Sequence, residues 1–129
     1  MKVLVIDDDD QICRMVAKVL CADGHEVVGA ADGLEGMTLF RRENPRVVVT
    51  DIIMPEQEGI ETIRIMRRER PEVKIIAISG GGALGDIEVL RIARMLGADD
   101  VIAKPFRAQE LRRRVRALDP GGGAAEISA

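Results

Sequence analysis

A β-branched run that ends in a carboxylate, residues 47–51, constrains the fold of this chain more than any other feature. Three consecutive valines are typical of a short strand that is buried on both faces of a parallel sheet. Asp51 stands where that strand must end, because a carboxylate is costly inside an apolar core. Pro55 then directs the chain into a loop. Because ligand chemistry in open parallel sheets gathers at the carboxyl ends of strands, Asp51 is predicted to lie at a functional edge.

Similar apolar segments recur along the chain and alternate with amphipathic ones. We expect strands at residues 2–6, 26–30, 47–50, 74–78 and 101–103. We expect helices from a cap at Asp9 or Asp10 to Gly24, from a capping box at Asp32 and Glu35 to about Glu43, and at residues 59–70, about 84–96 and 107–118. Such alternation predicts an α/β fold with right-handed crossovers and helices on both faces of a parallel sheet. A flavodoxin-like (βα)5 domain with strand order 2-1-3-4-5 is consistent with this pattern.

The chain length suits one domain with one aliphatic core. It has 129 residues, of which 47% are hydrophobic and only 2% aromatic, and neither Trp nor Tyr occurs. We expect residues 1–118 to form the domain and residues 119–129, rich in Gly and Ala, to be a flexible tail or the start of a linker. The net charge of −3 argues against general binding of nucleic acids or membrane surfaces. Without a secretory signal or a membrane-spanning apolar run, we expect a cytoplasmic location.

Five polar side chains follow the strands of the predicted sheet. Asp7 and Asp8 follow the first strand and Asp51 ends the third, so three carboxylates meet at one edge if the strand order is right. They repel one another unless a cation neutralises them, and Mg²⁺ prefers oxygen ligands of this kind. An aspartate can also attack phosphorus to form an acyl phosphate. Lys104 would supply positive charge and Ser79 a hydrogen bond, which suits phosphoryl transfer.

Each of these residues has a simpler explanation when it is taken alone. The acidic pair would be an ordinary helix-cap cluster, Ser79 a turn residue, and Lys104 a solvated surface lysine. The occurrence of all five at strand ends, in this order, favours a shared site.

The chain resembles the receiver domain of two-component response regulators, of the chemotaxis-regulator type. The resemblance covers residues 3 to about 118. It is carried by Val5-Ile6-Asp7-Asp8, by Asp51 with Met54-Pro55 and Gly59, by Ser79, and by Gly97-Ala98-Asp99 leading to Lys104-Pro105-Phe106. Order and spacing match together, which makes the set specific.

The resemblance implies a role for each of these polar residues. Asp51 corresponds to the phosphoacceptor, and Mg²⁺ would be held by Asp7, Asp8, Asp51 and the backbone carbonyl of Ile53. Ser79 corresponds to the switch hydroxyl and Lys104 to the phosphate-sensing lysine. In the family, the peptide bond corresponding to Lys104–Pro105 is usually cis.

The resemblance also implies partners. A sensor histidine kinase or a histidine phosphotransfer protein would donate the phosphoryl group. The surface formed by the fourth helix, fifth strand and fifth helix would then control a downstream protein or output domain, or pair in a homodimer. No membrane or direct nucleic-acid contact is expected, and the only reactions catalysed would be the domain's own phosphorylation and dephosphorylation. The family often has an aromatic residue three positions before the lysine, where this chain has Val101.

Three other functions compete with this interpretation. Gly80, Gly82 and Gly85 match a dinucleotide-binding pattern, but the acidic residue that the pattern needs at the end of the next strand is replaced by Lys104. A phosphohydrolase of the haloacid-dehalogenase type would use an Asp-x-Asp pair such as Asp7 and Asp9, but 129 residues leave no room for a cap domain. The third is a scaffold of the same shape that never takes phosphate.

The two cysteines and the one histidine do not suggest a second site. Cys13 and Cys21 fall eight residues apart in one predicted helix, too far apart to form a disulfide, and are expected to be reduced. His25 is expected at the surface in a turn, and one histidine supports neither a zinc site nor a Ser/His triad.

Overall fold

The parallel sheet predicted from the sequence is present. In the computed structural model, residues 1–52, 58–79, 91, 94–95 and 97–118 are described. Five parallel strands have the order β2-β1-β3-β4-β5, which confirms the flavodoxin-like α/β fold. The strands are β1 (Lys2–Ile6), β2 (Glu26–Ala30), β3 (Val47–Asp51), β4 (Lys74–Ser79) and β5 (Asp100–Ala103). Each strand begins and ends within one residue of its expected bounds.

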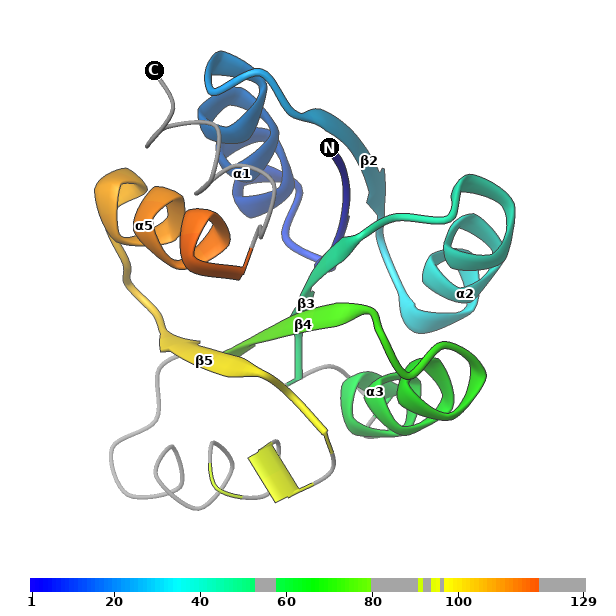
Figure 1. Cartoon of the computed structure of the whole chain (residues 1–129). Coiled ribbons are helices and arrows are strands. Elements are labelled where there is room, and N and C mark those ends of the chain that lie inside the picture. Colours follow the sequence, from blue (N-terminus) through cyan, green and yellow to red (C-terminus); the bar gives the residue numbers. More distant parts are fainter. Residues whose placement is uncertain (53–57, 80–90, 92–93, 96, 119–129) are drawn as a thin grey trace.

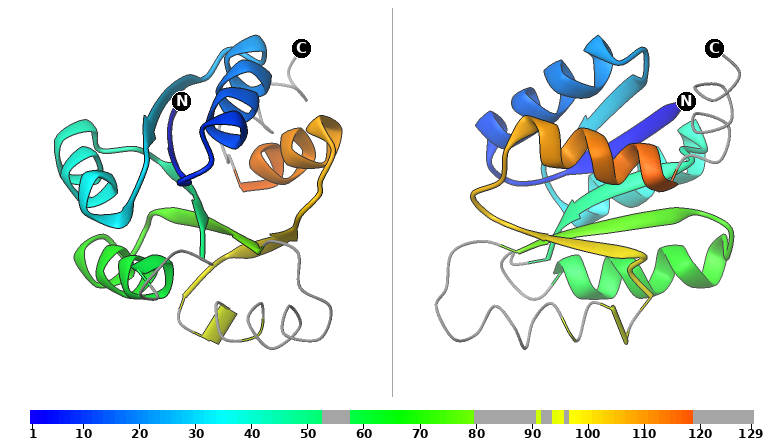
Figure 2. Two further views of the ribbon diagram at one scale, coloured as in Figure 1. Left: turned by 180° about the vertical axis from the view of Figure 1, so that it is seen from behind. Right: turned by 60° about the vertical axis from the view of Figure 1, so that its left-hand side comes forward.

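The helices form two layers, one on each side of the sheet. They are α1 (Asp10–Ala22), α2 (Gly33–Glu43), α3 (Glu58–Glu69) and α5 (Ala108–Leu118). Helices α1 and α5 cover one face and α2 and α3 the other (Figures 1 and 2). The helix expected at residues 84–96 and the tail expected at 119–129 lie outside the described residues, apart from residues 91 and 94–95, which are helical.

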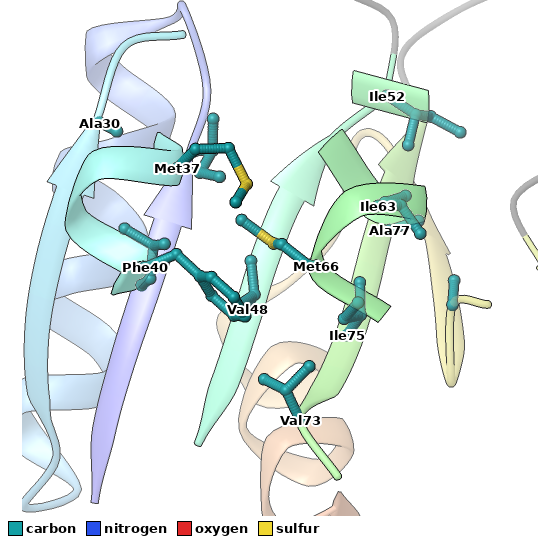
Figure 3. Close-up of a cluster of buried hydrophobic side chains, with 13 residues drawn as sticks. Ala30, Met37, Phe40, Val48, Ile52, Ile63, Met66, Val73, Ile75 and Ala77 are labelled. Carbon is teal, nitrogen blue, oxygen red and sulfur yellow. The ribbon is translucent and has the colours of Figure 1, made fainter. Parts of the chain in front are cut away.

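The alternation of side chains along β1 explains why its sequence is apolar throughout. Leu4 and Ile6 point into the cluster beneath α2 and α3, which is drawn in Figure 3, whereas Val3 and Val5 point into the cluster beneath α1 and α5. All four are at most 1% exposed. A strand covered on both faces has no polar side to alternate with, so its sequence reads as one apolar run.

Capping side chains fix the starts of α1 and α2 where the sequence placed them. Asp9 is the N-cap of α1, and its carboxylate accepts a hydrogen bond from the Gln11 amide at 2.9 Å. At α2, the Asp32 carboxylate accepts from the Glu35 amide at 2.8 Å, and the Glu35 carboxylate accepts from the Ala31 amide at 2.8 Å. The reciprocal pair confirms the predicted capping box, although Glu35 reaches one residue before the cap.

No helix among the described residues is long and apolar enough to cross a membrane.

The burial of two isoleucines on α3 predicts unequal losses of stability when each is replaced by alanine. Ile63 is fully buried against the sheet, whereas Ile65 is half-buried at the edge of the same cluster. Ile63→Ala should lower the free energy of unfolding by about 2–5 kcal/mol, because it removes buried surface and leaves a cavity. Ile65→Ala is the matched control and should cost clearly less. Urea denaturation measures both, and equal losses would contradict the packing described here.

Candidate functional site

The carboxyl edge of the sheet brings together polar residues that are far apart in the sequence. Asp7 follows β1, Asp51 is the last residue of β3, Ser79 is the last residue of β4, and Lys104 follows β5. The amide of Lys104 donates a hydrogen bond to the Ser79 carbonyl at 2.7 Å, which holds the end of β5 against the end of β4. The predicted site residues on these four strands therefore meet at one edge.

Three carboxylates form the acidic part of the site. One oxygen from each of Asp7, Asp8 and Asp51 can be chosen so that all three lie within 4.8 Å of one another. Asp7 is 1% exposed and Asp51 is 4% exposed, whereas Asp8 is exposed to solvent. Two of the three charges are therefore placed where water solvates them poorly, and their mutual repulsion is correspondingly strong.

Lys104 lies between the two buried carboxylates. Its Nζ is 3.0 Å from Asp7 Oδ2 and 3.3 Å from Asp51 Oδ2. Asp7 Oδ1 accepts a hydrogen bond from the Asp9 amide at 2.8 Å. Lys104 Nζ forms an ion pair with Asp7 Oδ2, and this buried oxygen is otherwise without a hydrogen-bond donor among the described residues.

The local environment shifts the pKa values of this ion pair. Burial raises the pKa of the Asp7 carboxyl, and the nearby charge of Asp51 adds to the effect, while the Asp9 amide and Lys104 oppose it. Burial alone would lower the pKa of Lys104, but its contacts with Asp7 and Asp51 outweigh burial and raise it. Ionised Asp7 is thus held at a cost, and Lys104 offsets part of that cost.

The chemistry of these donors fits a hard divalent cation. Mg²⁺ binds oxygen ligands and is commonly held by one or two carboxylates together with water and phosphate. Asp7, Asp8 and Asp51 supply such ligands. The buried Asp7 Oδ2 has no hydrogen bond among the described residues, and a bound cation would compensate for that lack. The acidic triad is therefore consistent with a metal site. The fourth expected ligand, the backbone carbonyl of Ile53, lies outside the described residues.

Three further expectations concern Ser79, the Lys104–Pro105 bond and the glycines after β4. Ser79 is fully buried at the end of β4, and the Lys104–Pro105 peptide bond is cis, as the resemblance implied. The glycines of the dinucleotide-like pattern, residues 80, 82 and 85, lie outside the described residues.

One contact of the site was not foreseen from the sequence. The Cys13 thiol points from α1 toward the ends of β1 and β2, and its Sγ lies 3.3 Å from the Asp7 carbonyl and 3.8 Å from the Ala30 carbonyl. Burial and the nearby charge of Asp7 raise the pKa of Cys13 to about 11. The thiol is therefore protonated at neutral pH and serves as a hydrogen-bond donor. Its sequence separation from Asp7 carries no signal for this contact.

Comparisons of sequence place this arrangement among known proteins. The response regulator receiver domain family matches residues 3–116. The chain is 41% identical over 117 residues to "Probable transcriptional regulator ycf27" of Cyanophora paradoxa, which covers 91% of this chain and 47% of that protein. It is 33% identical over 134 residues to "Response regulator MprA" of Mycolicibacterium vanbaalenii, covering 100% of this chain and 56% of that protein. The chain thus spans about half the length of these curated relatives.

Solved structures show the same architecture. The receiver domain of NtrX from Brucella abortus superposes with a TM-score of 0.83 at 31% identity, covering 90% of this chain and 96% of that one. A CheY-like response regulator receiver domain protein from Methanospirillum hungatei JF-1 also has a TM-score of 0.83, at 27% identity, with 99% of this chain and 98% of that one covered.

The crowded carboxylates predict a magnesium-dependent stability. Mg²⁺ should raise the melting temperature of the wild type. At a concentration ten times its Kd, it should add about 1.4 kcal/mol to the free energy of unfolding. Asp7→Asn should melt above the wild type in EDTA, because it removes a buried charge, and should lose the response to Mg²⁺. Asp10→Asn is the matched control, since Asp10 is exposed on α1 and lies outside the triad; it should keep the response. A wild type indifferent to Mg²⁺ would refute the shared site.

The raised pKa of Asp7 sets the direction of the pH effect. A carboxyl whose folded pKa exceeds its unfolded value favours the fold most when it is protonated, and this contribution is lost as pH rises through the folded pKa. Protons should also compete with Mg²⁺ in that range, so the apparent affinity for Mg²⁺ should fall as pH drops through it. Titrations of melting temperature against Mg²⁺ at several pH values measure this, and an affinity independent of pH would contradict it.

Proposed function

The chain belongs to the response regulator receiver domain family, and we propose that it is a phosphorylation-activated switch with Asp51 as its phosphoacceptor. Receiver domains typically act in two-component signalling and are not free-standing catalysts. The observation that carries the proposal is the position of Asp51: a buried carboxylate at the end of the central strand β3, with oxygens of Asp7 and Asp8 within 4.8 Å and Lys104 Nζ at 3.3 Å.

The proposed reaction transfers a phosphoryl group from a phosphohistidine of a partner. One oxygen of Asp51 forms a bond to phosphorus while the phosphorus–nitrogen bond breaks. The electron pair of that bond stays on the imidazole nitrogen, and the histidine leaves neutral because its other ring nitrogen carries the proton. The product on Asp51 is an acyl phosphate. In the same proposal, hydrolysis of this acyl phosphate resets the switch.

Most of the catalytic help would come from neutralising charge. Asp7, Asp8 and Asp51, with the carbonyl of Ile53, would hold Mg²⁺, which when bound offsets the negative charge of the transferring phosphoryl group. Lys104 is already placed between Asp7 and Asp51, at 3.0 and 3.3 Å. Its amine can pass from these carboxylates to a phosphoryl oxygen with little displacement.

We propose that Lys104 and Ser79 convert the modification into a change of surface. A phosphoryl group on Asp51 offers both side chains a charge-assisted hydrogen bond. Lys104 directly follows β5, and Ser79 ends β4 beside it. Drawing both side chains toward the phosphoryl group would change the surface formed by β5, α5 and residues 84–96. The change would be a shift between two populated packings. Val101, in place of an aromatic side chain, is half-buried against the core beneath α2 and α3. We therefore expect the segment of residues 80–82 to carry most of the change, with the Ser79 hydroxyl as its relay.

The proposed partners follow from this role. Receiver domains partner histidine kinases, and here the donor would be a sensor histidine kinase or a histidine phosphotransfer protein in the cytoplasm. The recipient would be a downstream protein, an output domain joined through residues 119–129, or a second copy meeting at the surface of β5 and α5. Residues 1–118 would be sufficient to accept the phosphoryl group.

Replacing Asp51 tests most directly whether it is the phosphoacceptor. Asp51→Asn should abolish the covalent adduct that forms with acetyl phosphate and Mg²⁺, because the amide cannot attack phosphorus. The matched control is Asp32→Asn at the cap of α2, where Asn also serves as an N-cap, so the fold and the adduct should both persist. Intact mass and peptide mapping measure the adduct. An unchanged yield in Asp51→Asn would rule out Asp51 as the site, and turnover of a small phosphomonoester would point to a hydrolase instead.

Removing the switch hydroxyl should separate modification from response. Ser79→Ala should still accept phosphate on Asp51 but should show much weaker changes in amide hydrogen exchange over residues 79–90 when beryllofluoride is added. Exchange measured by mass spectrometry in both proteins tests this relay. Equal changes in wild type and Ser79→Ala would show that the hydroxyl does not transmit the signal.

A further inference from the structure

A hollow lies at the edge of the sheet opposite the acidic site. It has a volume of about 340 Å³ and is formed at the amino ends of the strands, where residue 1 precedes β1, Arg46 precedes β3 and Lys74 begins β4. Leu118, the last residue of α5, forms part of its rim. Pockets that bind ligands begin at about 300 Å³, so the hollow has room for a few side chains.

The lining of this hollow, which we call the amino-edge hollow, has an apolar floor. Pro45 and Val73 are buried there, and Met1 and Leu118 are half-buried. An apolar floor gains free energy when an aliphatic side chain covers it.

The rim of the amino-edge hollow is basic. Arg46 and Lys74 have no ion-pair partner among the described residues, and Glu72 is the one acidic side chain on the lining. A third cation, Arg70, is already engaged, because its guanidinium donates to the Phe40 carbonyl at 3.0 Å and to the Pro45 carbonyl at 3.1 Å. The bond to Phe40 offsets part of the negative charge at the end of α2. Arg46 and Lys74 are therefore the two cations of the rim that an acidic group can pair with.

The segment that follows α5 has the chemistry to fill this hollow. In residues 119–129 the only charged side chains are Asp119 and Glu126, both acidic, and the only large apolar side chain is Ile127. Three glycines at 121–123 allow the chain to reverse direction. Ile127 is nine positions after Leu118, a reach of up to about 30 Å.

We propose that the segment 119–129 docks back into the amino-edge hollow, with Ile127 on the apolar floor and Glu126 beside Arg46 and Lys74. Because the segment is tethered at the rim, its effective concentration is of the order of millimolar, so even a weak contact is populated. The docked segment would fix the direction in which the chain leaves α5, at the edge remote from Asp51. This inference is independent of phosphorylation.

Amide chemical shifts of the full 129-residue chain test the docking. Ile127→Asp should move the signals of Arg46, Val73 and Lys74, because the segment is released, and Glu126→Lys should move the same signals part of the way. Ser128→Asp is the matched control: it adds the same charge one residue away without removing the apolar anchor, and should leave these signals in place. None of the three changes touches the core, so loss of folding does not confound the comparison.

Two results would overturn the proposal. The first is that Ile127→Asp leaves the three signals where they are in the wild type, or moves them no more than Ser128→Asp does. The second is that the shifts between wild type and Ile127→Asp vanish on dilution, which would assign the hollow to the segment of another copy.

Discussion

The placement of Lys104 between two buried carboxylates is the interaction on which the candidate site depends. Asp7 and Asp51 are almost fully buried within one small volume, and their charges can coexist there only with a cation between them. Lys104 supplies one positive charge at 3.0 and 3.3 Å, yet one Asp7 oxygen still lacks a hydrogen bond. The site is thus partly neutralised at rest, and its acidic triad is consistent with a metal site; in the proposed reaction, a phosphoryl group would compete directly for the lysine.

This arrangement depends in turn on a sheet that is covered on both faces. Because α1 and α5 pack on one side and α2 and α3 on the other, the interior strands β1, β3 and β4 are mostly apolar, and their charged side chains stand only where the strands begin or end (Figure 1). The parallel strands bring those ends to one edge. The opposite edge receives the ends of α2, α3 and α5 and carries the basic rim of Arg46 and Lys74, so the two edges of one sheet are suited to different partners.

The sequence alone predicted the parts of the molecule that are governed by local rules. The strands at residues 2–6 and 26–30 and the caps at Asp9 and Asp32 follow from periodicity and from short-range hydrogen bonding, and the structure confirms them. The gathering of Asp7, Asp8 and Asp51 followed once the strand order was assumed. Contacts set by packing were out of reach, because no short-range pattern encodes them: the Cys13 thiol on the Asp7 carbonyl, and a hollow assembled from the starts of strands and the ends of helices.

The proposed switch requires Lys104 to exchange its carboxylate partners for a phosphoryl group. A crystal structure of the protein with Mg²⁺ and beryllofluoride measures this exchange directly. We expect a beryllofluoride group on an Asp51 oxygen, with Mg²⁺ held by Asp7, Asp8 and Asp51. Lys104 Nζ should lie within hydrogen-bonding distance of a fluorine and be displaced from Asp7 Oδ2. An adduct on Asp51 that leaves Lys104 at its present distances from Asp7 and Asp51, or an adduct on another residue, would contradict the proposed switch.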